Sequence, residues 1–221
     1  MIFTELNAFG YEYNGVFYNA EFEDILSKII YCYNLMIADK VSLTNNENAI
    51  RDVLLINYLK DNSIRKKIKL TDYLFDREVP EDRSIGRTDI KIQTQNTFQD
   101  TNAYYIIECK RLDATNLNGT TGLNAKYIKD GMFRFASTTY STHYKTNGMI
   151  GFVVEPMDIN ANVTSINNLV ANNFPEANTT EELQYREIVK DFPFSYCSRH
   201  NLVEDSVMLY HLMFNFSKEI Q

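Results

Sequence analysis

The chain has 221 residues and a formal net charge of −7 at pH 7, and 44% of its residues are hydrophobic. This length and composition are typical of one globular domain with a sizeable core, and they exclude a disordered or low-complexity chain. The sequence has no apolar run long enough to cross a bilayer and no signal peptide at its start, so we expect a cytoplasmic protein without a membrane partner.

The first sixty residues predict a hairpin and two helices. The Asn14-Gly15 step lies between aromatic residues, a pattern typical of a β-hairpin turn. Apolar residues then recur at helical spacing over 21–38 and again over 46–59, where polar capping residues precede them. A basic run at 65–69 follows, and residues 75–84 are expected to form a polar connection.

The centre of the chain predicts a second hairpin. Apolar residues alternate over 85–92, a polar turn covers 96–102, and bulky residues fill 104–112. After a polar loop we expect a helix over 123–140 and a buried strand over 148–155.

The last third adds helices over 160–172 and 180–190 and two final strands, within 192–200 and 207–217. This order predicts an α/β fold with a mixed central β-sheet flanked by helices. We expect a single domain over 1–221, with a core at about 45–155 and extensions at 1–44 and 156–221.

Two carboxylates are predicted to meet on the central hairpin. Pairing its strands around the 96–102 turn can bring Asp89 beside Glu108. Adjacent carboxylates repel each other unless a cation lies between them, and oxygen ligands of this kind suit Mg²⁺. The main-chain carbonyl of Cys109 is placed to add a further ligand. We therefore expect Asp89, Glu108 and the Cys109 carbonyl to hold Mg²⁺, with Mn²⁺ as a substitute.

Lys110 completes this set. It lies two residues after Glu108, so on a strand both side chains point to the same side. Its amine can orient or deprotonate an attacking water and offset negative charge that develops on a phosphate. Asp89, Glu108 and Lys110 are thus the expected catalytic residues of a metal-dependent hydrolase.

The charge distribution permits a nucleic-acid substrate. Residues 61–145 carry 14 Lys and Arg against 11 Asp and Glu, although the chain as a whole is acidic. Phosphate binding depends chiefly on such positive charge.

The Asp89, Glu108 and Lys110 pattern resembles the PD-(D/E)xK nucleases, which have the restriction-endonuclease-like fold. The resemblance covers about 45–155 by the order of elements, an α-β-β-α-β core, and it departs from the family name because Thr88 precedes Asp89. It implies that Asp89 and Glu108 bind Mg²⁺ while Lys110 assists the attacking water.

The same resemblance implies one more acid, from the first helix of the core. Glu47 is our choice for this catalytic and metal-binding position, and Asp52 and Glu23 remain alternatives.

The helix that follows the hairpin is expected to face the metal in such nucleases. Tyr127, Gly131 and Arg134 share one helical face. We expect Lys126, Tyr127 and Arg134 to contribute there, by contacting the phosphate or by positioning other groups. Gly131 is expected to permit a close approach to the strand or the substrate.

These observations predict a Mg²⁺-dependent endonuclease that acts on DNA. The resemblance suits a restriction or anti-phage defence system, in which a homodimer or a partner subunit supplies specificity. Two alternatives stay open: a nuclease-fold protein that binds nucleic acid or a partner protein without cutting, and a structural subunit in which Glu108 and Lys110 form only a salt bridge.

Overall fold

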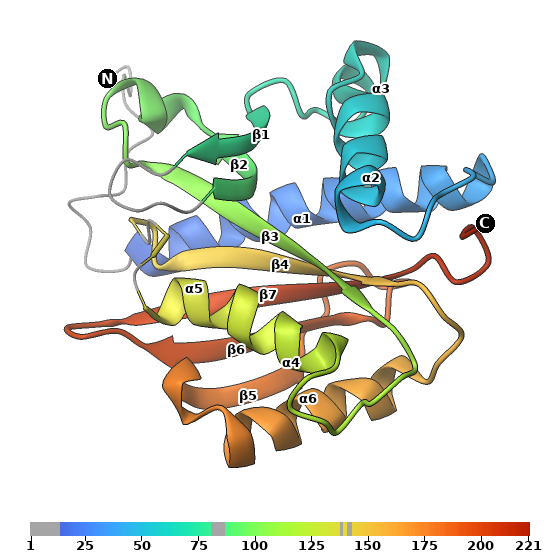
Figure 1. Ribbon diagram of the computed structural model, residues 1–221. Helices are drawn as coiled ribbons and strands as arrows, with labels where there is room; N and C mark the ends of the chain where they lie inside the picture. Colours follow the sequence, from blue (N-terminus) through green and yellow to red (C-terminus); the bar gives the residue numbers. More distant parts are fainter. Residues whose placement is uncertain (1–13, 81–86, 138, 141–142) are drawn as a thin grey trace.

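The computed structural model describes residues 14–80, 87–137, 139–140 and 143–221. Within these residues, seven strands form one mixed sheet in the order β1-β2-β3-β4-β7-β6-β5 (Figure 1). The strands are β1 (Leu74–Pro80), β2 (Arg87–Gln93), β3 (Tyr104–Leu112), β4 (Thr146–Val153), β5 (Thr179–Tyr185), β6 (Ser195–Asn201) and β7 (Ser206–Asn215).

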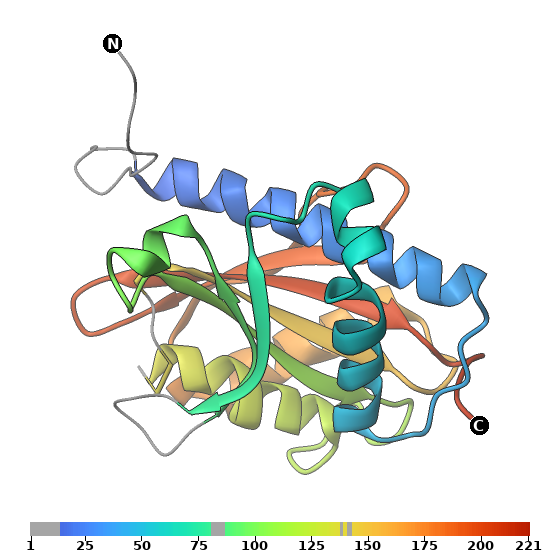
Figure 2. The same cartoon turned by 90° about the horizontal axis from the view of Figure 1, so that it is seen from above.

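Helices cover both faces of the sheet (Figure 2). One face carries α1 and α2, and α2 continues directly into the wider π-type turns of η1. The other face carries the short helices α4, η3 and α5, which run end to end, and α6. These helices are α1 (Asn14–Ala38), α2 (Glu47–Asp52), η1 (Val53–Leu59), α3 (Asn62–Lys67), α4 (Leu123–Tyr127), η3 (Ile128–Met132), α5 (Phe133–Ala136) and α6 (Ile159–Asn173).

Each face has its own apolar core. The first core joins α1 and η1 to the sheet through residues such as Phe22, Leu54 and Ile90. The second joins α4, η3, α5 and α6 to the opposite face through residues such as Met132 and Ile166. Because β3 and β4 carry side chains of both cores, both strands are buried on both faces.

The strand register places the expected site at β2 and β3, the second and third strands of the sheet. β2 and β3 pair antiparallel, with Ile90 opposite Ile107. β3 and β4 pair parallel, and a parallel pair needs a crossover connection. The helices α4, η3 and α5 form this crossover, so they lie directly over β3.

The predicted mixed sheet with flanking helices is confirmed, as are the central hairpin, the helices near 21–38, 46–59 and 160–172, and the final strands. The N-terminal hairpin turn is wrong, because Asn14 and Gly15 begin α1, which buries Tyr18 and Phe22 on the sheet. Residues 1–13, the rest of that predicted hairpin, lie outside the described residues.

Three further predictions are wrong, two in the type of element and one in where a helix ends. The expected connection at 75–84 contains most of β1, an edge strand whose polar, half-exposed residues hid it. The expected helix at 180–190 overlaps β5, the opposite edge strand, because pairing with β6 outweighs its helix-forming composition. The helix expected over 123–140 ends at Ala136.

Over the described residues, the structure contains no helix with the length and hydropathy needed to span a membrane.

Candidate functional site

The site lies where β2 and β3 separate. Their pairing ends at Ile90 and Ile107, one step before Asp89 and Glu108. Beyond that point the backbone of β3 bonds to a side chain of β2 and no longer to its backbone. Asp89 Oδ2 accepts the Cys109 N–H at 2.8 Å. The fork between the strands thus turns the Asp89 carboxylate toward the backbone of β3.

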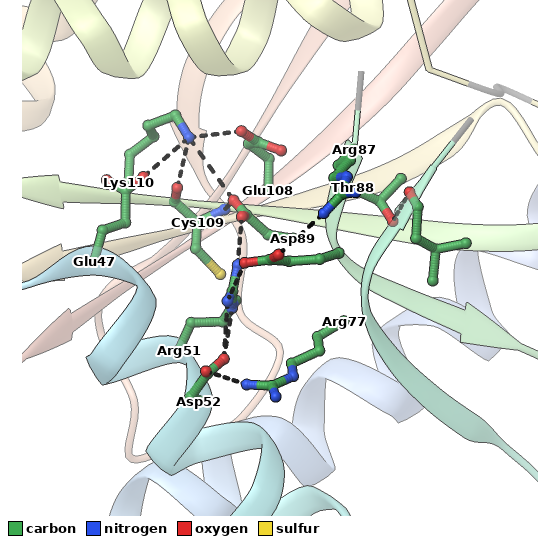
Figure 3. A network of polar contacts seen from close by, with 12 residues as sticks. Glu47, Arg51, Asp52, Arg77, Arg87, Thr88, Asp89, Glu108, Cys109 and Lys110 are labelled. Atoms are coloured by element: carbon green, nitrogen blue, oxygen red, sulfur yellow. Dashed lines mark hydrogen bonds and ion pairs between the residues drawn. The ribbon is translucent and has the colours of Figure 1, made fainter. Parts of the chain in front are cut away.

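The Lys110 ammonium lies at the centre of the fork (Figure 3). Its Nζ donates to Glu108 Oε1 at 2.6 Å and to the Cys109 carbonyl at 2.8 Å. It also donates to Glu47 Oε1 at 3.3 Å and forms an ion pair with Asp89 Oδ2 at 3.8 Å. The structure therefore brings all four oxygen groups that were expected to hold a metal around one cation, which is the amine of the same chain.

Glu108 is the most enclosed of these acids. Its side chain is 1% exposed, and Oε1 also accepts a hydrogen bond from Arg134 Nη1 at 3.0 Å. The Tyr140 hydroxyl donates to Oε2 at 2.6 Å. Burial and the nearby Asp89 raise the pKa of Glu108 to about 7, although Lys110 and Arg134 act in the opposite direction.

Lys110 stays protonated in this setting. Burial alone would lower the pKa of its amine, but Glu108, Asp89 and Glu47 outweigh burial and raise that pKa above its ordinary value. The amine therefore acts as a fixed positive charge at neutral pH, and it can lose a proton only after the surrounding acids are neutralised.

Glu47 reaches the fork from the first turn of α2. The Asn46 side chain caps this helix by accepting the Ala49 N–H. Glu47 Oε2 then accepts the Arg111 N–H at 2.9 Å, so the two Glu47 oxygens bridge Arg111 and Lys110.

The two alternatives to Glu47 lie elsewhere. Asp52 is bound by Arg51 and Arg77, and Glu23 is bound by Arg186 and Tyr210. Neither acid contacts Lys110 in the structure, so only Glu47 among the three joins the fork.

Of the three residues expected from the α4 to α5 crossover, one contacts an acid of the fork. Arg134 reaches Glu108, and Lys126 is exposed nearby. Tyr127 is fully buried, and its hydroxyl pairs with His211 Nδ1 at 2.8 Å, so in this structure it does not line the pocket that Lys126 and Arg134 line. Gly131 does permit a close approach, because a Cβ there would lie 2.3 Å from the Met149 methyl group on β4.

An open pocket of about 370 Å³ lies over the fork, with Lys110 in its wall. Its charged lining has four cations and two acids, which gives the pocket a positive balance: Lys110, Arg111, Lys126, Arg134, Glu47 and Asp130. Positive charge gathered in a pocket attracts anions.

Two residues of the site have no counterpart in the sequence-based expectations. Tyr140 lies outside the helices and strands, and nothing in its local sequence predicts a contact with Glu108. Arg51 is 1% exposed and donates from Nη1 to Asp89 Oδ1 at 3.0 Å. The sequence offered one signal for this contact: Arg51 lies four residues after Glu47, so both share one face of the helix.

Each acid of the fork already has a cationic partner in the chain. Glu47, Asp89 and Glu108 contact Lys110, Asp89 also contacts Arg51, and Glu108 also contacts Arg134. In the described part of the chain, no group of three or more His, Cys, Asp or Glu side chains is already arranged to hold a metal ion.

Comparison of the chain with family models, with curated proteins and with solved structures found no match.

Proposed function

We propose that this protein is a Mg²⁺-dependent phosphodiesterase that cuts DNA, with Asp89, Glu108 and Lys110 as its catalytic residues. One observation carries the proposal: oxygens of Asp89, Glu108, Glu47 and Cys109 surround a single cationic centre at 2.6 to 3.8 Å. Burying an amine among three acids carries a large desolvation cost, so this arrangement is poorly explained by a stabilising salt bridge alone.

The donor set fits Mg²⁺ chemically. Every group around the centre is an oxygen ligand, and carboxylates with waters or phosphate oxygens are what Mg²⁺ prefers. Asp89, Glu108 and the Cys109 carbonyl would hold the ion, with Glu47 as a further ligand. The Lys110 amine must first withdraw, because it now lies within hydrogen-bond distance of Glu108 and Cys109. The open pocket beside Lys110 provides space for this movement.

A bound metal would supply Lewis-acid activation of the scissile phosphate. The residues of the chain then have separate tasks. Lys110, once released from the acids, orients the attacking water and offsets the charge that develops on the phosphate. Arg134 and Lys126 bind the phosphate from the wall of the pocket. Tyr140 holds Glu108 in place by hydrogen bonding.

The order of elements around the fork supports a restriction-endonuclease-like core. An acidic helix (α2), the β2 and β3 hairpin, the α4 to α5 crossover and β4 occur in the expected sequence, with β1 added before the hairpin. On this basis we propose a role in restriction or anti-phage defence in the cytoplasm. A homodimer or a partner subunit would supply target specificity.

A second candidate function has an observation of its own. Each acid of the fork already has a cationic partner in the chain, and the described residues contain no preformed metal group. These facts favour a protein that keeps the nuclease fold and binds nucleic acid or a partner without cutting.

Cleavage assays separate the two functions. Purified protein would be incubated with plasmid, linear and single-stranded DNA and with RNA, in Mg²⁺, Mn²⁺ or EDTA. The proposal predicts metal-dependent cutting that is lost in Lys110→Ala and Glu108→Gln. The matched controls Lys190→Ala and Glu182→Gln, at exposed positions outside the pocket, should cut as the wild type does. Binding without cutting in every condition would instead support the second function.

A further inference from the structure

A second charged cluster centres on Arg51, which does not line the pocket. Its guanidinium binds three carboxylates from three elements: Asp52 of α2, Glu78 of β1 and Asp89 of β2. The distances are 2.9 Å from Nη2 to Asp52, 3.0 Å from Nη2 to Glu78 and 3.0 Å from Nη1 to Asp89. The Arg51 side chain is 2% exposed, so it cannot contact a substrate.

Arg51 determines which way the Asp89 carboxylate is turned. Oδ1 of Asp89 accepts from Arg51, while Oδ2 accepts from the Cys109 N–H and faces Lys110. Because each oxygen has a partner on a different side, the carboxylate cannot rotate without losing a charge-assisted hydrogen bond. The planar guanidinium of an arginine suits this task because it donates in several directions, whereas a lysine offers a single point charge.

Glu78 has an unusual backbone that serves the same cluster. Its φ is 49°, in the left-handed region that side chains other than glycine and asparagine rarely adopt. Of the described non-glycine residues with positive φ, it is the only one inside a strand. In the β1 to β2 register Glu78 lies between the pairs Arg77 with Ile90 and Val79 with Thr88, opposite Asp89. Backbone strain of this kind concentrates at functional sites.

We propose that Arg51 is a positioning residue for Asp89, and that the left-handed turn of β1 at Glu78 exists to hold Arg51 in place. This inference rests on the proposed function, because the Arg51 cluster would direct Asp89 Oδ2 toward the position of the metal. Arg51 acts through Asp89 and touches neither metal nor phosphate.

Two variants and one control test the proposal. Arg51→Lys keeps the positive charge and removes the planar guanidinium. Glu78→Asn removes the carboxylate and keeps a residue that tolerates the left-handed backbone. The control is Lys69→Asn, an exposed residue outside the cluster with a φ of 55°. Like Glu78→Asn, this control places an asparagine at a left-handed position, but it leaves the contacts of Arg51 unchanged.

The readout is amide hydrogen exchange at Cys109, whose N–H is held by Asp89. Ile107, two residues earlier in β3 and paired with Ile90, is the internal reference for opening of the whole strand. We expect Cys109 exchange to accelerate about tenfold relative to Ile107 in Arg51→Lys and Glu78→Asn, and to stay within about twofold of wild type in Lys69→Asn.

An unchanged ratio of Cys109 to Ile107 exchange in folded Glu78→Asn and Arg51→Lys would overturn the positioning role. If Arg51→Lys fails to fold, Glu78→Asn decides alone. Calorimetric titration of the same samples with Mn²⁺ is a separate arm, in which both variants should bind more weakly than wild type and Lys69→Asn. A wild type that binds no Mn²⁺ would contradict the proposed function, while the exchange ratio would still decide the positioning of Asp89.

Discussion

Magnesium affinity should fall as the pH drops through 7, because Glu108 must lose a proton before it can bind a cation. Burial and the charge of Asp89 raise the pKa of Glu108 to about 7 in the metal-free protein, against the influence of Lys110 and Arg134. A carboxyl group with a raised pKa is protonated below that value and ionised above it. Metal binding therefore releases a proton from Glu108 at acidic pH and releases none at alkaline pH.

The size of the effect follows from that pKa. Glu108 is about nine-tenths protonated at pH 6, half at pH 7 and about one-tenth at pH 8. The apparent affinity for Mg²⁺ should consequently weaken by about tenfold from pH 8 to pH 6, equivalent to about 1.4 kcal/mol.

Isothermal titration calorimetry at these three pH values, in buffers of different ionisation enthalpy, measures both the affinity and the protons released. We expect about 0.9 proton per metal at pH 6 and about 0.1 at pH 8. Glu108→Gln should abolish the proton release, and Glu182→Gln should retain it. Wild-type affinity that is flat from pH 6 to pH 8, with no proton release, would refute the reasoning.

The same raised pKa affects the stability of the metal-free protein. The folded state keeps a proton on Glu108 between pH 4.5 and about 7, where the unfolded chain releases it. The contribution of Glu108 to the free energy of unfolding should therefore decrease as the pH rises through this window. Thermal melts of wild type and Glu108→Gln in EDTA check this sign, and a contribution that increases with pH would contradict it.

Four further substitutions follow from the site. Lys110→Met should abolish cleavage yet bind Mn²⁺ more tightly than wild type in calorimetry, because the competing ammonium is gone; weaker binding would contradict the arrangement. Tyr140→Phe should lower the free energy of unfolding in denaturant by about 1 to 3 kcal/mol, because the Glu108 carboxylate loses a hydrogen-bond donor. The same loss should shift the proton-release profile of Glu108 to higher pH, and an unshifted profile would count against this contact. Lys126→Ala should weaken DNA binding and reduce its salt slope by about 1, with folding unchanged. Tyr127→Phe should leave the salt slope unchanged and cost about 1 kcal/mol of stability, because its buried hydroxyl pairs with His211. The opposite pattern in these two variants would place Tyr127 at the phosphate.

The central pair could be predicted because its signal is local. The 96–102 turn determines the register of the hairpin, and the register brings Asp89 and Glu108 to adjacent positions at the fork. Lys110 follows from the two-residue period of a strand. The choice among Glu47, Asp52 and Glu23 depended on which acid points to β3. In the structure Glu47 contacts Lys110 and the backbone of Arg111.

The missed features depend on contacts between distant segments. Tyr140 and Arg87 are far apart in sequence, and the hydroxyl of Tyr140 joins the Arg87 carbonyl to Glu108 only in the folded chain. The edge strands β1 and β5 are half-exposed, so neither has the apolar alternation that identifies a buried strand. Tyr127 lies on the predicted helical face, but tertiary packing directs it to His211 in the core.

The most direct test of the account is the position of a bound metal. Anomalous diffraction from crystals soaked in Mn²⁺ should show one peak between the carboxylates of Asp89 and Glu108 and the Cys109 carbonyl, with the Lys110 amine displaced toward the pocket. A fork that still holds Lys110 against Glu108, with no peak beside it at saturating Mn²⁺, would contradict the account.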